Sequence, residues 1–222
     1  MYANQVIGGI VMDVPAEIAR RYAALPRHDT PTVRALRREF TRRLATTPGT
    51  EVIRIAERLI GVPGLRFVAY ELCFHHPAAF ARLRTATVRR LGRGLSSWGD
   101  VDCFACYVAG PAWHARQIPD DVVFAWTRSP DRWWRRAALV STVPLHGDTT
   151  RTLRICTALM EDRDPMVWKA VSWALRALSK HHPTAARRFV DSHEAALARG
   201  VVREVRSKLD TGLKSPRRAL RP

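Results

Sequence analysis

The sequence predicts an all-α protein, and three observations support this fold class. Apolar residues recur at the three- to four-residue spacing of amphipathic helices along almost the whole chain, whereas the alternation typical of strands is nearly absent. Residues that commonly cap helices stand before a proline in three places, which are Thr30-Pro31, Ser129-Pro130 and Asp164-Pro165. The stretches between the helical segments are short, which favours antiparallel neighbours.

In chain order, we expect helices over residues 14–25, 31–45, 50–60, 65–74, 77–92, 98–109, 119–128, 130–142, 149–160, 165–180, 183–192 and 199–210. The length of 222 residues favours one domain, which we place at residues 1–210. Residues 211–222 contain glycine, proline and four basic residues, and we expect them to form a flexible tail. No apolar run reaches the roughly 20 residues of a membrane span, and residues 1–11 do not resemble a signal peptide.

A weak internal repeat refines the fold class. Residues 66–72 (RFVAYEL) and 169–175 (KAVSWAL) are each followed by His-His-Pro, and residues 136–140 (RAALV) open in the same basic-then-apolar way. A helix pair that repeats every 30 to 35 residues or so is typical of an α-solenoid of HEAT-like repeats. We therefore expect such a solenoid, with a basic concave surface. The paired histidines are interpreted as parts of repeated turns rather than as metal ligands.

The charge balance indicates a polyanionic partner. The chain has 37 basic and 20 acidic residues, a net charge of +17, and only four of its basic residues are lysine. Coding bias could account for the excess of arginine over lysine but not for the shortage of acids. Nucleic acid is the leading candidate partner.

The four cysteines do not predict a metal or redox site. Cys103 and Cys106 form a C-x-x-C pair, but no second pair exists and no histidine follows at the spacing of a zinc finger. We therefore expect the thiols to be buried and reduced. We also expect that the protein uses no metal and no cofactor. Its expected location is the cytoplasm, in association with the nucleoid.

Three segments carry the residues that could perform chemistry, namely residues 97–102 (SWGDVD), 131–136 (DRWWRR) and 168–176 (WKAVSWALR). In the first, Trp98 and Asp102 are four residues apart and share a helix face, and Gly99 lets a ligand approach the indole. On spacing alone, an ordinary acid of the first helical turn that complements the helix dipole is the better explanation of Asp102. In the second, arginines next to tryptophans suit phosphate binding, although a buried tryptophan pair with solvated charges is the alternative.

Taken in order, these motifs resemble the AlkD-like DNA alkylpurine glycosylases, which are HEAT-like repeat proteins. The resemblance runs from about residue 21 to residue 206. It rests on Arg21-Tyr22, on Thr30-Pro31 before a basic helix, and on residues 97–102, 133–139 (WWRRAAL) and 169–176 (KAVSWALR).

The resemblance implies a role for each matching position. Asp102 corresponds to the catalytic aspartate, and Trp98 and Trp173 correspond to an aromatic pair that flanks the deoxyribose of the lesion. Arg136 corresponds to an arginine that contacts the DNA backbone, and Tyr22 to an aromatic residue that faces the duplex. We assign Arg135 and Lys169 to DNA binding as well.

The expected function is therefore that of a monomeric DNA glycosylase acting on cationic N3- or N7-alkylated purines in double-stranded DNA. The family works without a deep base pocket, so bulky adducts and self-resistance to DNA-alkylating natural products fall within the expected range. Two alternatives stay open at this point. One is a non-catalytic HEAT-repeat protein that binds nucleic acid, and the other is a protein–protein scaffold.

Overall fold

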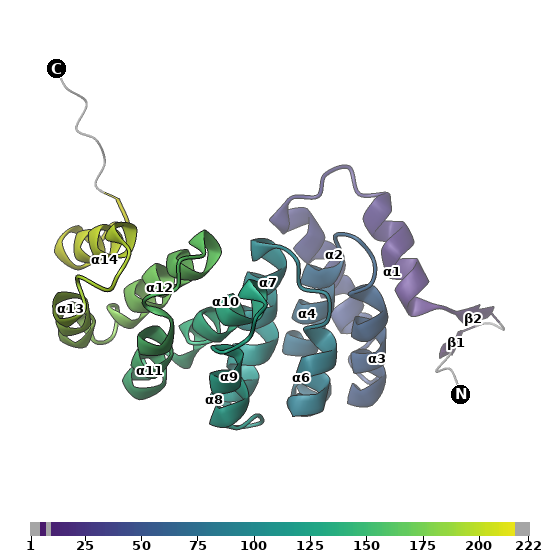
Figure 1. Cartoon of the computed structure of the whole chain (residues 1–222). Coiled ribbons are helices and arrows are strands. Elements are labelled where there is room, and N and C mark those ends of the chain that lie inside the picture. The colour runs from purple at the N-terminus through teal and green to yellow at the C-terminus, as the bar shows by residue number, and fades with distance from the viewer. Residues whose placement is uncertain (1–4, 8–9, 216–222) are drawn as a thin grey trace, which may run out of the picture. The chain divides into compact units, whose positions relative to one another are not determined.

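The computed structural model describes residues 5–7 and 10–215, and nearly all of its regular structure is helical (Figure 1). The exception is a short antiparallel hairpin of β1 (Gln5–Ile7) and β2 (Ile10–Met12), in which Gln5 is opposite Met12. The sequence did not predict this hairpin, because three-residue strands are too short to show an alternating pattern. The expected all-α fold, an α-solenoid of helical repeats, is confirmed.

Contacts between residues divide the chain into two compact units. The N-terminal unit comprises Met1–Gly94 and Tyr107–Ile118, and the C-terminal unit comprises Leu95–Cys106 and Pro119–Pro222. The assignment of residues 1–210 to one domain stays a prediction. Within the expected tail, Thr211 still belongs to the last helix, and residues 216–222 lie outside the described residues.

The N-terminal unit is built around one amphipathic helix, α3, which packs against four of its neighbours, α1, α4, α5 and α6. Helix α2 packs against α1 and α4. The buried side chains of α2, α3 and α4 supply much of its apolar core. The helices of this unit are α1 (Val14–Ala23), α2 (Thr30–Arg43), α3 (Gly49–Leu59), α4 (Arg66–His75), α5 (Pro77–Phe80), α6 (Thr85–Leu91) and α8 (Gly110–His114).

The C-terminal unit stacks helix pairs in two layers, as the repeat predicts. Helix α10 packs against α7, α9, α11 and α12, and α12 packs in turn against α13 and α14 (Figure 1). Helices α10, α12 and α14 begin at Arg132, Pro165 and Arg199, which gives the spacing of the repeat. The helices are α7 (Trp98–Phe104), α9 (Asp120–Trp126), α10 (Arg132–Val140), α11 (Thr149–Leu159), α12 (Pro165–Leu178), α13 (Pro183–Ser192) and α14 (Arg199–Thr211), with a 3-10 turn at Val143–Leu145.

Two of the three expected helix starts are shifted by the nearest carboxylate. Asp29, not Thr30, caps α2 by accepting a hydrogen bond from the backbone N–H of Thr32 at 2.9 Å. Asp131, not Ser129, caps α10 by accepting from the N–H of Trp133 at 2.8 Å. The expected start at Asp164 is confirmed, since its side chain accepts from the N–H of Met166 at 2.8 Å.

Two of the expected helices differ from their expected bounds by more than two residues or are interrupted. The helix expected over 77–92 is interrupted at residues 81–84, where the chain turns and buries Leu83 completely. The helix expected over 98–109 continues to His114 through a π-helical turn at Ala105–Ala109. This wide turn ends two residues before Pro111, which has no N–H to donate to the preceding turn.

The start of α3 depends on a glycine. A Cβ atom at Gly49 would lie 2.0 Å from the carbonyl oxygen of Ala78, so α3 and α5 approach too closely for any side chain there. We predict that Gly49→Ala lowers the free energy of unfolding by about 1–3 kcal/mol, measured by chemical denaturation. Gly61→Ala is the control, because its Cβ would meet only the carbonyl oxygen of Arg58 at 3.6 Å. Equal stability of the two variants would contradict this packing.

Candidate active site

Helix α7 presents Trp98 and Asp102 one turn apart. Its start is fixed by Ser97, whose hydroxyl accepts a hydrogen bond from the N–H of Asp100 at 3.1 Å. Trp98 is 62% exposed, which is unusual because tryptophan side chains are mostly buried in folded proteins. A Cβ at Gly99 would meet only the Ser97 hydroxyl, at 3.9 Å, so the surface beside Trp98 is open.

Asp102 is held by a two-pronged ion pair with Arg136 of α10. Nε of Arg136 donates to Oδ1 at 2.9 Å, and Nη2 donates to Oδ2 at 2.8 Å. The third nitrogen, Nη1, donates to the backbone carbonyl of Met166 at 2.6 Å, at the start of α12. The Arg136 side chain is only 8% exposed and the Asp102 side chain 16%. Arg136 therefore joins α10 to both α7 and α12.

Two opposing effects act on the Asp102 carboxyl. Burial raises its pKa above the ordinary value, and the hydrogen bonds and positive charge of Arg136 lower it. Burial is the larger effect, so the pKa lies above its ordinary value. A carboxylate has about four lone-pair sites, and Arg136 occupies two of them, which leaves acceptor capacity for a further group.

Trp173 lies on α12, which packs against α10. The two helices are also joined by the hydrogen bond from Arg136 to the Met166 carbonyl. Its side chain is half-buried. The preceding residue, Ser172, is fully buried and donates from its hydroxyl to Glu204 of α14 at 2.6 Å. Trp98 and Trp173 are therefore carried by α7 and α12, the two helices that α10 joins through Arg136.

The remaining candidates for DNA binding differ in how they are placed. Lys169 is exposed, with Nζ 5.8 Å from the ring centre of Trp168. Arg135 is largely engaged locally, because its Nε donates to Asp162 at 2.7 Å and its Nη1 to two loop carbonyls. Tyr22 belongs to the N-terminal unit, where its ring lies against His28, at 4.5 Å between centroids. DNA contact by these residues stays a prediction.

The two tryptophans of the second motif have different environments. Trp134 packs into an aromatic cluster, with ring-centre distances of 5.8 Å to Phe104 and 4.9 Å to Trp126. Trp133 is half-buried like Trp134, and the guanidinium of Arg132 lies 4.7 Å from its ring centre. Trp134 therefore fits the packing interpretation, and phosphate binding by this segment stays a prediction.

The cysteines are free thiols in the structure. Burial raises the pKa of Cys106 to about 12, and the charge of Asp102 adds to this effect. The thiol is therefore neutral near pH 7. Within residues 5–7 and 10–215, no group of three or more His, Cys, Asp or Glu side chains is placed to hold a metal ion.

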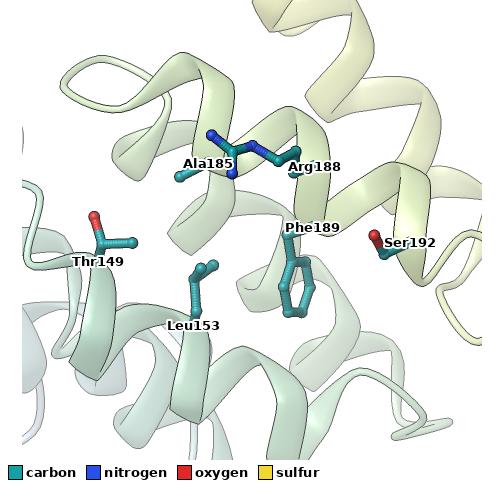
Figure 2. A pocket seen from close by; sticks show the side chains of 6 residues that line it. All are labelled: Thr149, Leu153, Ala185, Arg188, Phe189 and Ser192. Atoms are coloured by element: carbon teal, nitrogen blue, oxygen red, sulfur yellow. The ribbon is translucent and has the colours of Figure 1, made fainter.

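A separate cavity of about 350 Å³ lies between α11 and α13 (Figure 2). Its lining includes no acidic residue, and Arg188 is its only charged one. It therefore lacks a carboxylate or an imidazole that could act as a general base. The lining residues are Thr149, Leu153, Ala185, Arg188, Phe189 and Ser192.

The fold and these contacts define the chain as an α-solenoid in which an arginine-bound carboxylate adjoins an exposed tryptophan. The family model for DNA alkylation repair enzymes matches residues 28–209, so the chain belongs to that family. The matched segment includes Trp98, Asp102, Arg136 and Trp173, and Tyr22 lies outside it. A search of curated proteins and a search of solved structures each found no significant match.

None of the helices in the described part of the chain is long and apolar enough to cross a membrane.

Sequence reasoning missed the partners of the arginines on α10. Asp162 and the carbonyl of Met166 were not singled out, although they bind Arg135 and Arg136. An acid three residues before Pro165 gave a weak signal, but no periodic pattern connects it with an arginine 27 residues earlier. A backbone carbonyl gives no signal at all in a sequence.

Removing Arg136 should destabilise the fold, because the buried Asp102 carboxylate would lose its cationic partner. We predict that Arg136→Gln lowers the free energy of unfolding near pH 7 by about 3 kcal/mol. The loss should be smaller near pH 4, because the Asp102 pKa is already raised in the fold and rises further without Arg136, so protonation of the carboxyl stabilises the variant as the pH falls. Denaturation at both pH values measures the difference.

The control for this prediction is Arg187→Gln, which removes the exposed pair between Arg187 and Asp210. An exposed pair contributes about 0–1 kcal/mol, so this variant should lose little stability at either pH. If Arg136→Gln loses the same free energy of unfolding at both pH values, the prediction is wrong. Arg136 would then not stabilise the fold by compensating the charge of Asp102.

Proposed function

We propose that this protein is a DNA glycosylase that hydrolyses the N-glycosidic bond of cationic N3- or N7-alkylated purines in double-stranded DNA. The observation that carries the proposal is the Asp102 carboxylate, which Arg136 holds by two hydrogen bonds one helical turn from the exposed Trp98. Membership of the DNA alkylation repair family supports the type of substrate.

The chemistry of an alkylated purine matches a site of this kind. Alkylation at N3 or N7 makes the base positively charged, so the electron pair of the C1′–N bond leaves with the base and neutralises it. The leaving group then needs no strong general acid. Positive charge develops instead on the sugar, as in other glycosyl transfers. A nearby carboxylate stabilises that charge.

Within this proposal, Asp102 acts on the sugar and on the water. Its negative charge stabilises the cationic sugar, and its free acceptor sites orient a water molecule toward C1′ and take up the proton as the new C–O bond forms. Trp98 and Trp173 place their aromatic faces against the electron-poor sugar and base, each contact contributing about 0.5–2 kcal/mol. Arg136 positions the carboxylate, and because its side chain is only 8% exposed, its proposed contact with a DNA phosphate would be made through one of its two unused N–H groups.

The positive charge of the chain supports duplex DNA as the partner. An excess of 17 positive charges attracts the phosphate backbone. Lys169 is the best exposed of the four proposed DNA-binding residues, with Arg135, Arg136 and Tyr22 as the others. We propose that the protein acts as a monomer, without a metal or cofactor, on DNA in the cytoplasm.

The open surface at Trp98 supports a wide range of adducts. Trp98 is 62% exposed, and a Cβ at Gly99 would meet only the Ser97 hydroxyl, so we propose that an alkyl group larger than methyl can be accommodated against the exposed indole. Bulky adducts of the kind left by DNA-alkylating natural products are therefore included in the proposal, and self-resistance to such compounds is one biological use.

Asp102→Asn tests the proposed role of the carboxylate. The change keeps the size of the side chain but removes its charge, so we predict that base release from duplex DNA containing 7-methylguanine slows by at least about 100-fold. Single-turnover kinetics with saturating protein measures the chemical step, and fluorescence anisotropy measures DNA binding, which should be retained.

Asp210→Asn is the matched control, since it makes the same change in an exposed acid paired with Arg187. Its rate should equal that of the wild type. An Asp102→Asn variant as fast as the wild type would remove the carboxylate from the mechanism. A wild type that binds the duplex but releases no base would favour a non-catalytic nucleic-acid-binding protein.

A further inference from the structure

Three arginines of α10 hold the segment that joins α11 to α12. Arg135 and Arg136 follow Arg132 by three and four residues, so both lie on the same side of the helix as Arg132. Arg132 contacts Asp164 at 3.4 Å and Arg135 contacts Asp162 at 2.7 Å, both in this segment, and Arg136 contacts the carbonyl of Met166 in the first turn of α12 at 2.6 Å.

Asp162 uses both of its carboxylate oxygens in this segment. Oδ2 accepts from Nε of Arg135 at 2.7 Å, and Oδ1 accepts from the backbone N–H of Asp164 at 2.9 Å. Its side chain is only 12% exposed. Arg135 also donates to the carbonyls of Ser129 and Pro130, each at 2.9 Å. Asp162 thus fixes the chain immediately before α12 against the start of α10.

The same contacts continue to the carboxylate of Asp102. Asp164, whose N–H is held by Asp162, caps α12 by accepting from the N–H of Met166. The carbonyl of Met166 accepts from Nη1 of Arg136, whose other two nitrogens bind Asp102. Because the guanidinium group is planar and rigid, fixing Nη1 also fixes the direction of the two donors that face Asp102.

We propose that Asp162 is a positioning residue for Asp102. By holding the start of α12, it keeps the Met166 carbonyl where it orients the Arg136 guanidinium for two simultaneous hydrogen bonds to the carboxylate. The inference rests on the proposed function insofar as Asp102 is taken to be the reacting carboxylate.

Loss of Asp162 has a consequence that differs from a general loss of stability. When the Met166 carbonyl shifts, Arg136 turns and its hydrogen bonds to Asp102 weaken, so burial acts on the carboxyl with less opposition. The pKa of Asp102 then rises. The titratable and charged groups that act on Asp102 are Arg136 from α10 and Cys106 from its own helical segment, and the Cys106 thiol stays neutral over this range.

Asp162→Asn is the first test, and Asp120→Asn is its matched control. The control breaks the pair between Asp120 and Arg151, at 2.8 Å, in the same unit but away from Arg136. Carbon-13 NMR of the carboxyl groups reports the pKa of Asp102 in the free protein. The rate of base release from 7-methylguanine DNA as a function of pH reports the same group during turnover.

For Asp162→Asn, we expect the Asp102 pKa and the acid limb of the rate profile to rise together by about 0.5–1 pH unit. Neither should move in Asp120→Asn. Arg135→Lys keeps the positive charge but cannot bind Asp162 and the two loop carbonyls together, so it should shift the Asp102 pKa in the same direction without a change of charge. If Asp162→Asn does not fold, the Arg135 variant tests the positioning role of Asp162 instead. The NMR measurement is made without DNA, so a contact between Arg135 and DNA does not affect it.

An unchanged Asp102 pKa in the folded Asp162 or Arg135 variant would overturn the inference, even if the wild type releases base. An equal shift in Asp120→Asn would also overturn it, because the effect would then reflect general loosening of the unit. A wild type that releases no base would contradict the proposed function, whereas the NMR result would still decide the role of Asp162.

Discussion

The ion pair between Asp102 and Arg136 is the interaction on which the arrangement of the C-terminal unit depends. A largely buried carboxylate is costly unless a cation and hydrogen bonds compensate it. Arg136 supplies both and uses its third nitrogen on the carbonyl of Met166. One side chain of α10 therefore determines how α7 and α12 meet it, and with them the helices that carry Trp98 and Trp173.

The same pair explains how a strongly basic chain can carry the carboxylate that we propose acts on the sugar. An isolated carboxylate close to a phosphate backbone would be repelled by it, and burial alone would favour its protonated form. Arg136 opposes both effects, and in the proposed reaction it helps the carboxylate to approach a sugar between phosphates. In the proposed reaction, the carboxylate increases the rate to the extent that it stabilises the positive charge developing on the sugar more strongly than the positive charge of the intact substrate.

Much of the fold could be predicted from the sequence, because its signals are local. Helical spacing and the Asp164-Pro165 start are properties of neighbouring residues, and they located α12 correctly. The start of α10 was misplaced by two residues because Asp131 competes with Ser129 as the cap. The site could be predicted only in part, since the i to i+4 spacing placed Trp98 and Asp102 on one face. The pairing of Asp102 with Arg136 joins residues 34 apart, and no local pattern encodes it.

The central claim is that the protein breaks the bond between an alkylated purine and its sugar. Identifying the products formed from duplex DNA containing 7-methylguanine, by mass spectrometry and against the rate of spontaneous loss, tests this most directly. The account predicts free 7-methylguanine and an abasic site in the strand, formed faster than without protein. Unmodified guanine left in the strand, or no product above the spontaneous rate, would contradict it.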